Sequence, residues 1–307
     1  MKKEKTQKSS SADPCLKNVK RSGAAFCRAV ETRTAHMYEK INVLLQNRDK
    51  TQFFSELPKQ FPPLISSFSP EPDAASPLKD ELDFTADSVH GYDGILAARY
   101  LRKTAGYGDI PSLYFSVYTE KTEGERIAYF KNPLADAAFS HFSKKMTSPS
   151  VSYVQDLHSV CEAVYYEKAP YGILPLYNSR DGRLSGFYGL VDKYELFVTS
   201  ECSVYSSDNE TVTRFALLSK HPHGEGAVTG KEVYFEFRIP HDGVTLSQLL
   251  SAAYCYGLEN VSVDSLPADI KNADVLIFKG KGEAVCDMLF YMYCTDCQYT
   301  LIGVYEE

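Results

Sequence analysis

Two cysteines near the C-terminus, Cys294 and Cys297, have the C-x-x-C spacing that zinc sites and redox centres use. A closed zinc site needs a second pair of ligands, and His221 and His223 are the weak candidates in this chain. We therefore expect two ordinary half-buried thiols and no metal. The two histidines are interpreted as part of a polar connector between domains.

The charge of the chain argues against nucleic acid as a partner. The formal net charge is -7, and the one basic cluster lies at the extreme N-terminus, at Lys2, Lys3, Lys5 and Lys8. A phosphate backbone favours clustered Lys and Arg, and this cluster contains no aromatic residues. No run of about 18 apolar residues is present, so we expect no membrane span. No secretory signal is recognisable, which predicts a reducing, cytoplasmic setting for the eight cysteines.

The elements that would position a site begin late in the chain. Residues 1–21 are rich in Lys and Ser and predict a disordered tail. Residues 22–57 have a helical pattern, with Met37, Ile41, Leu44 and Leu45 on one face. Residues 58–125 contain repeated prolines and predict a linker and lead-in that cannot hold a helix at its start. A short helix at 92–103 and a strand at 113–118 are expected within it.

Residues 126–222 alternate between apolar strands and amphipathic helices. This rhythm predicts an α/β domain with a mostly parallel sheet flanked by helices. Strands are expected at 127–130, 151–154, 171–176, 196–198 and 213–218, with helices at 134–145 and 157–164.

Residues 229–307 predict a second unit with the order βαββαβ, which is a ferredoxin-like arrangement. Its first strand is expected at 233–239. Thr245 and Gln248 form a capping box at the start of the first helix. Two further strands, a second helix and a closing strand at 299–305 complete the order.

Three stretches resemble the prephenate dehydratase family. Residues 171–179 (YGILPLYNS), with Gly182 following, are similar to the family signature YGVLPIENS…G. Residues 213–218 (TRFALL) resemble the family strand TRFLVL, and 129–139 match its first strand-to-helix turn in outline. The C-terminal unit resembles the ACT domain that follows the dehydratase. The resemblance implies one periplasmic-binding-protein-like α/β lobe, then an ACT-like domain, behind a helical N-terminal region.

By this resemblance the chain converts prephenate to phenylpyruvate, with loss of CO2 and water, in L-phenylalanine biosynthesis. The match assigns Thr213 as the catalytic proton donor to the leaving hydroxyl. It assigns substrate binding to Arg214, Phe215, Asn178 and Ser179. The ACT-like motifs place L-phenylalanine as an effector at His241, Leu246, Asp264 and Ser265. The family needs no metal or organic cofactor, and paired ACT domains imply a homodimer.

The chain also departs from the family pattern. Tyr177 replaces the glutamate of the signature, and Lys131 and Leu134 replace the glycines of the first turn. The family inserts a second lobe where this chain has only residues 199–212. These changes favour an alternative, a non-catalytic protein that senses an amino acid or binds a partner. A weaker alternative is a degenerate chorismate mutase–dehydratase fusion, in which the N-terminal helix supplies the cations Arg28, Arg33, Lys40 and Arg48.

Overall fold

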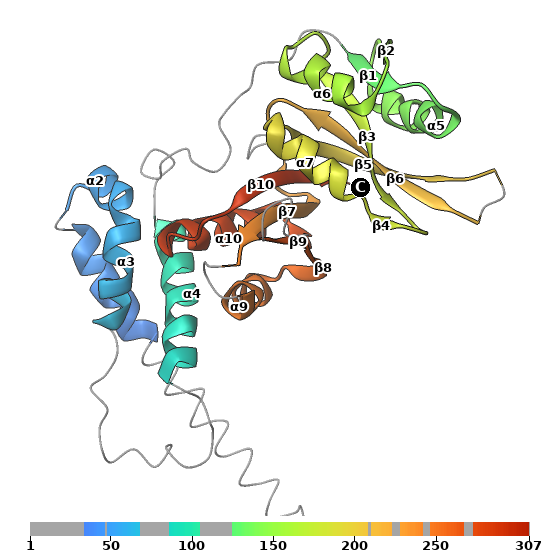
Figure 1. Cartoon of the computed structure of the whole chain (residues 1–307). Helices are drawn as coiled ribbons and strands as arrows, with labels where there is room; N and C mark the ends of the chain where they lie inside the picture. The colour runs from blue at the N-terminus through green and yellow to red at the C-terminus, as the bar shows by residue number, and fades with distance from the viewer. Residues whose placement is uncertain are drawn as a thin grey trace, which may run out of the picture.

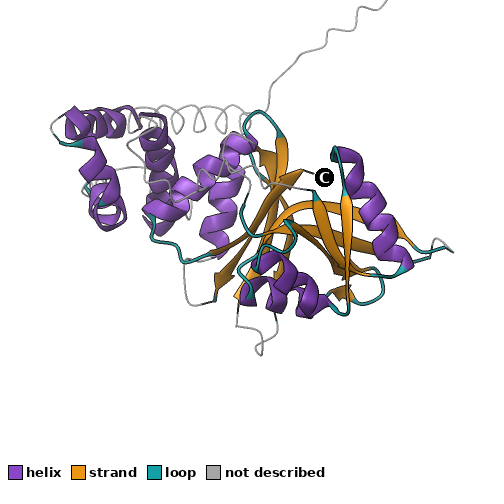
Figure 2. Cartoon of the chain, turned by 90° about the horizontal axis from the view of Figure 1, so that it is seen from above, coloured by secondary structure: helices purple, strands orange, loops and turns teal. Residues whose placement is uncertain are grey.

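The computed structural model describes residues 34–46, 48–67, 86–104, 125–207, 210–222, 228–241, 246–266 and 273–306. The expected tail at 1–21, the expected strand at 113–118 and the Thr245 cap lie outside these residues. The described part is a mixed α/β protein with one large sheet and a group of N-terminal helices at one end (Figures 1 and 2).

The N-terminal helices are a helix over residues 34–46, α2 (Lys50–Ser55), α3 (Leu57–Ser66) and α4 (Ala86–Thr104). We call them the N-terminal helical layer. The amphipathic pattern predicted for the first helix is confirmed over 34–46, where Met37, Ile41 and Leu45 are buried. The helix expected at 92–103 is present as α4 and begins six residues earlier.

The expectation that residues 58–66 cannot hold a helix is wrong. Pro58 lies in the first turn of α3, where a missing N–H breaks no helical hydrogen bond, whereas Pro62 and Pro63 lie inside the helix. An interior proline costs about 3 kcal/mol. The buried side chains of Leu57, Phe61 and Ile65 offset this, at about 1.5–3 kcal/mol each. Burial of these side chains in the core therefore outweighs the low helix propensity of the prolines in α3.

The helical layer shares its hydrophobic core with the C-terminal part of the chain. One cluster of buried residues runs from Met37 to Leu101 and continues from Val228 to Val304. Across this contact the Tyr256 hydroxyl donates to the Ile95 carbonyl oxygen at 2.8 Å, and the Tyr293 hydroxyl donates to the Phe54 carbonyl oxygen at 2.8 Å. Figure 1 shows α3 and α4 beside α10. The layer is therefore an integral part of the fold.

The α/β part covers residues 125–222. Its elements follow the predicted order of strands and helices: β1 (Arg126–Phe130), α5 (Pro133–Phe142), the 3-10 turn η1 (Ser143–Lys145), β2 (Ser150–Val154), α6 (Leu157–Tyr165), β3 (Tyr171–Asn178), β4 (Gly182–Arg183), α7 (Ser185–Lys193), β5 (Phe197–Tyr205) and β6 (Val212–Ser219). Helices α6 and α7 pack on one cluster of buried side chains and α5 on another, so helices flank both faces.

The prediction of a mostly parallel sheet needs correction. Strand β1 pairs in parallel with β2 and β3, but β6 pairs antiparallel with both β3 and β5. The segment 199–212 is also not a simple loop. Strand β5 continues to Tyr205 and pairs antiparallel with β6, from Phe197 opposite Ser219 to Tyr205 opposite Val212. A strand can run this far because Val198, Thr199, Glu201 and Cys202 are buried along it.

The C-terminal unit covers residues 228–306 and has the order βαββαβ: β7 (Glu232–Pro240), α9 (Leu246–Tyr256), β8 (Glu259–Ser265), β9 (Ala273–Lys281), α10 (Gly282–Cys294) and β10 (Thr300–Glu306). Its strands lie in the order β10-β7-β9-β8, all antiparallel to their neighbours. Strand β10 also pairs in parallel with β5. Both parts of the chain therefore share one continuous ten-stranded sheet.

Candidate functional site

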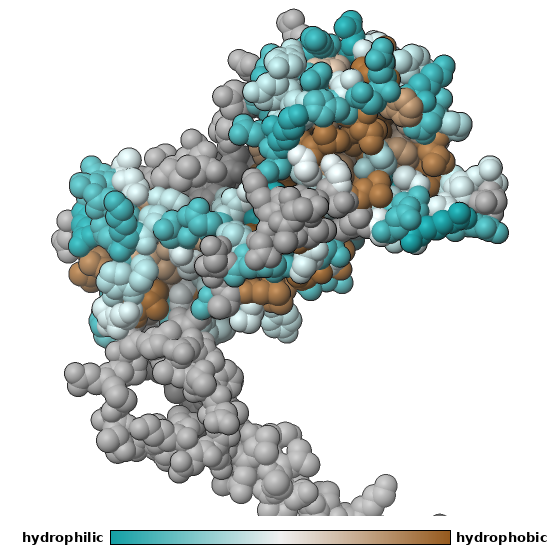
Figure 3. Space-filling model, in the orientation of Figure 1, coloured by the Kyte–Doolittle hydropathy of each residue, from teal (hydrophilic) through white to brown (hydrophobic). Residues whose placement is uncertain are grey.

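A cavity of about 350 Å³ lies beside the last residues of β1 and β3 and the first residues of β6. We call it the Thr213 cavity. Most of its wall is apolar: Phe130, Leu134, Ala135, Leu157, Ile173, Pro175, Leu184 and Phe215. Its polar lining is Asn132, Asn178, Asp181 and Thr213. Figure 3 shows hydrophobic residues gathered on the surface of the α/β part. The position fits the rule that open α/β sheets bind ligands beyond the carboxyl ends of their strands.

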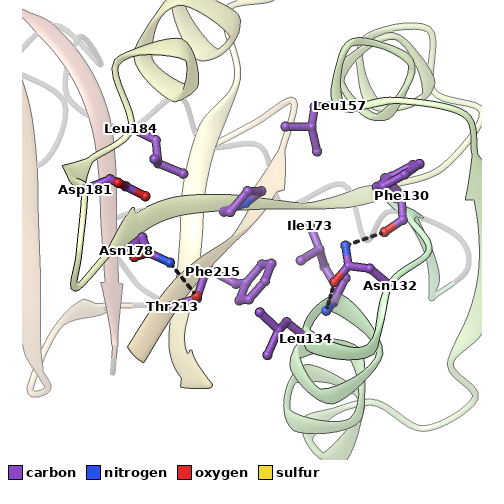
Figure 4. Close-up of a pocket in the computed structure, with 12 residues that line it drawn as sticks. Phe130, Asn132, Leu134, Leu157, Ile173, Asn178, Asp181, Leu184, Thr213 and Phe215 are labelled. Carbon is purple, nitrogen blue, oxygen red and sulfur yellow. Dashed lines mark hydrogen bonds between the residues drawn. The ribbon is translucent and has the colours of Figure 1, made fainter. Parts of the chain in front are cut away.

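Thr213 and Asn178 meet on one wall of this cavity. They face each other across the β3–β6 pair, and the Asn178 side-chain amide (Nδ2) donates to the Thr213 hydroxyl oxygen at 3.2 Å (Figure 4). The Asn178 amide oxygen accepts from the backbone N–H of Arg180 at 2.9 Å, which fixes the orientation of the side chain. Thr213 is 6% exposed. Two residues far apart in the sequence thus form one oriented polar pair.

The opposite end of the cavity is the start of α5. The Asn132 side-chain oxygen accepts from the Ala135 backbone N–H at 2.9 Å, so Asn132 caps this helix. Its Nδ2 atom donates to the Phe130 carbonyl oxygen at 3.3 Å (Figure 4). Neither Asn132 nor Asp181 was predicted as a site residue. The Asn132-Pro133 pair directly after a strand is a helix-start signal that locates this turn in the sequence.

The charge of the cavity differs from what a dicarboxylate needs. Asp181 is the one charged residue among the described residues that line it. The Asp181 side chain is exposed and makes no ion pair with another described residue. The Lys131 ammonium lies 4.8 Å from the centre of the Tyr153 ring. The cavity wall is therefore weakly negative.

Arg214 does not line this cavity, in contrast to its expected role beside Thr213. Successive residues of a strand point to opposite faces, so Arg214 lies on the other side of the sheet. Its guanidinium pairs with the Glu201 carboxylate, which is 4% exposed. The Tyr305 hydroxyl donates to Glu201 at 2.6 Å and lies 3.0 Å from a carboxylate oxygen of Glu236. Glu236 also accepts from the Tyr188 hydroxyl at 2.7 Å.

We call Arg214, Glu201, Glu236, Tyr188 and Tyr305 the buried carboxylate cluster. It joins α7, β5, β6, β7 and β10, at the place where β10 pairs with β5. Burial and the neighbouring Glu236 carboxylate raise the pKa of Glu201 above its ordinary value. The cluster links the two parts of the sheet through hydrogen bonds and one ion pair.

The other predicted site residues are divided between two places. Phe215 lines the Thr213 cavity, whereas the Ser179 hydroxyl accepts from the Val212 backbone N–H at 3.0 Å and serves the turn. In the C-terminal unit, His241 Nε2 lies 3.0 Å from the Asp274 carboxylate, and the Ser265 hydroxyl donates to the same carboxylate oxygen at 2.6 Å.

The two remaining predicted effector residues, Leu246 and Asp264, lie elsewhere in the C-terminal unit. Leu246 packs partly buried against the core that the C-terminal unit shares with the helical layer. Asp264 is partly buried in β8, where it lies opposite Val275 of β9. His241 and Ser265 therefore converge on Asp274, and Leu246 belongs to the hydrophobic core.

The cysteines of the C-x-x-C pair are buried free thiols, rather than half-buried ones. Burial raises the pKa of Cys297 to about 11 and raises that of Cys294 well above its ordinary value. Metals bind the thiolate, which burial disfavours. Within the described ranges no three His, Cys, Asp or Glu side chains gather as a metal site requires.

None of the described helices combines the length and the apolar character needed to cross a bilayer. No family model matches the sequence, and no curated protein matches it either.

Solved structures show a partial likeness. A prephenate dehydratase from Streptococcus mutans is 18% identical, with a TM-score of 0.47 over 59% of this chain and 98% of that chain. A prephenate dehydratase from Arthrobacter aurescens, in complex with L-Phe, is 11% identical, with a TM-score of 0.47 over 59% of this chain and 90% of its own. A structure described as a novel type of quorum-quenching acylase is 18% identical, with a TM-score of 0.42 over 60% and 95% of the two chains.

Proposed function

We propose that this chain is a relative of the prephenate dehydratases that binds a small molecule in the Thr213 cavity and does not dehydrate prephenate. The observation that carries the proposal is the pairing of Thr213 with Asn178 on a cavity wall while Arg214 faces the other side of the sheet. Thr213 and Asn178 are therefore available to bind a ligand, whereas Arg214 pairs with Glu201 inside the protein.

Electrostatics support binding over the family reaction. Prephenate carries two carboxylates, and no Lys, Arg or His is among the described residues that line the cavity. Two like unit charges about 5 Å apart repel by roughly 3 kcal/mol at an effective dielectric constant of about 20. Asp181 is exposed, and solvent reduces this repulsion. The negative charge of Asp181 nevertheless disfavours a dianion, and catalysis requires still stronger stabilisation of developing charge.

The second candidate is the dehydratase itself. The buried Thr213 hydroxyl faces the cavity and is a neutral proton donor, which is the role that the resemblance assigns to it. One experiment separates the candidates. Purified protein is incubated with prephenate, and phenylpyruvate is followed by its absorbance.

We expect no turnover above the uncatalysed rate for the wild type. Turnover that Thr213→Val abolishes would establish the dehydratase and remove our proposal. Binding to the cavity is tested separately by ligand-observed NMR with a mixture of small aromatic and aliphatic acids, amines and amino acids. Thr213→Val should weaken the binding of whichever compound binds. If no compound binds, or if Thr213→Val changes nothing, the cavity has no ligand role.

The C-terminal unit is part of this proposal. Its βαββαβ order and its strand order support an ACT-like regulatory unit, and pairing of two such units would give a homodimer. Sedimentation equilibrium tests the homodimer prediction directly. The mutase alternative has little support in the described residues. Lys40 donates to the Ser67 carbonyl oxygen and Arg48 to the Gln60 side chain, so the two cations do not face one cavity.

A further inference from the structure

The Thr213 hydroxyl lines the cavity and has one proton that is available for a hydrogen bond. Its oxygen accepts the hydrogen bond from Asn178, so its own proton must be donated in another direction. Within the described part of the chain no acceptor takes this proton. Thr213 is 6% exposed, and buried hydroxyl groups are nearly always satisfied. Because Thr213 lines the cavity, the acceptor that it needs belongs to the occupant of the cavity.

The other polar groups of the cavity divide into used and unused ones. The Asn132 side-chain oxygen accepts the hydrogen bond that caps α5, and one N–H of its amide donates to the Phe130 carbonyl oxygen. Asp181 lies near Asn178 and Leu184 and offers a carboxylate, which can only accept hydrogen bonds (Figure 4). Each side-chain amide has two N–H groups and uses one of them, so the unused groups are three donors, from Thr213, Asn178 and Asn132, and one anionic acceptor, from Asp181. The rest of the wall is apolar.

We propose that the Thr213 cavity binds a zwitterionic α-amino acid with an apolar side chain. Its carboxylate accepts from the Thr213 hydroxyl and the Asn178 amide, and its ammonium donates to Asp181. Its side chain contacts the apolar wall that Ile173 and Phe215 share with the start of α5. The inference rests on the proposed function, which makes this cavity a binding site.

Other ligand classes leave one side of the cavity unmatched. A monocarboxylate or a dicarboxylate satisfies Thr213 but brings a like charge towards Asp181. An amine satisfies Asp181, but an ammonium has no lone pair to accept from Thr213. The volume of about 350 Å³ lies at the small end of the range of about 300–1,000 Å³ for ligand pockets, which suits a molecule with one ring.

Isothermal titration calorimetry on the full chain tests the ligand class. The probes are L-phenylalanine, 3-phenylpropionate (which lacks the ammonium), 2-phenylethylamine (which lacks the carboxylate) and prephenate. We expect L-phenylalanine to bind at least tenfold more tightly than each of the other three. If any of the other three binds as tightly as L-phenylalanine, the proposed ligand class is wrong, and the Thr213→Val variant then decides whether the cavity is still a binding site.

Variants test the location. Asp181→Asn should weaken the binding of L-phenylalanine by about three- to fivefold, which is the scale of an exposed ion pair. The binding of 3-phenylpropionate should be unchanged or tighter. Thr213→Val should weaken L-phenylalanine by about tenfold, while Thr213→Ser keeps the hydroxyl and retains binding. The matched control is Asp296→Asn, at an exposed aspartate of the C-terminal unit. This control variant should bind L-phenylalanine as tightly as the wild type does.

The competing location is the predicted effector site in the C-terminal unit. Asp264→Asn tests it, with circular dichroism confirming that each variant is folded. Loss of L-phenylalanine binding in Asp264→Asn, with unchanged binding in Asp181→Asn and Thr213→Val, would overturn the inference. Absence of binding by every probe would overturn the inference, whereas the ligand role of the cavity is decided by the NMR experiment with the mixture of acids, amines and amino acids.

Discussion

Replacing Tyr305 with phenylalanine removes one hydroxyl from the place where the two parts of the sheet join. Tyr305 is 1% exposed, and its hydroxyl lies 2.6 Å from a Glu201 oxygen and 3.0 Å from a Glu236 oxygen. The substitution keeps the ring, which stacks 5.8 Å from the Tyr234 ring. It therefore tests the hydrogen bonds of the buried carboxylate cluster with little change in packing.

The size of the effect follows from the partners. A hydrogen bond to a charged group contributes about 1.5–3 kcal/mol, and a buried acceptor left without its donor keeps the full desolvation cost. Arg214 still faces Glu201 in the variant, so the carboxylate is not left without a cation. We expect Tyr305→Phe to lower the free energy of unfolding by about 2 kcal/mol at neutral pH.

The pH dependence has a definite sign. Burial and the Glu236 carboxylate raise the pKa of Glu201 above 4.5, so the folded protein holds this proton more tightly than the unfolded chain does. The stability that this proton contributes is complete below pH 4.5 and is lost as the pH rises through the folded pKa. The Tyr305 hydrogen bond opposes the rise in the pKa of Glu201. Without it the pKa is higher, and the variant loses more stability at pH 8 than at pH 4.

Urea denaturation of wild type and variant at pH 4 and pH 8 measures both the size and the sign. The control is Tyr254→Phe, which removes the hydroxyl of a side chain that is 83% exposed. We expect this control to lie within about 0.5 kcal/mol of the wild type at both pH values. A loss in Tyr305→Phe no larger than in the control, or larger at pH 4 than at pH 8, would show that the cluster does not stabilise the sheet as argued.

Three further changes test other parts of the fold. Gly303→Ala places a Cβ against the Val198 carbonyl oxygen where β10 meets β5, and a urea titration should show a loss of about 1–3 kcal/mol. Phe54→Ala removes a ring that is 0% exposed and packs against Phe290; we expect a loss of about 3–5 kcal/mol and faster limited proteolysis of the helical layer. Asn132→Ala deletes the cap of α5 and should lower stability by about 0.5–2 kcal/mol, measured by thermal unfolding.

The α/β part was predictable because its signals are local. Strand and helix patterns along residues 126–178 depend on neighbours within a few positions, and β1, α5, β2, α6 and β3 follow them closely. The pairing of Asn178 with Thr213 was implied only through the family resemblance, and the structure brings the two side chains together. The place of Asp181 in the cavity lining could not be predicted, because a lone aspartate in a polar turn has no distinguishing pattern.

The helical layer shows where local reasoning fails. Pro62 and Pro63 are strong local signals against a helix, and no local pattern measures the contribution that opposes them. The opposing contribution is burial against α4 and α10, which lie far away in the chain. Phe54 and Phe61 are each 3% exposed or less, and only the assembled core makes their burial visible.

The strand that carries Thr213 and Arg214 serves two sites at once, and this bears on how its motif is interpreted. Thr213 faces the cavity, and Arg214, one position later, faces Glu201 on the other side of the sheet. Glu201 lies on the neighbouring strand β5, 13 positions from Arg214, and it also accepts from Tyr305, 104 positions away, because β10 pairs with β5. No local pattern indicates that pairing. Because the cluster gives Arg214 a role in the structure, the presence of the Thr-Arg-Phe run is not evidence of dehydratase chemistry. Evidence for that chemistry has to come from what the cavity binds.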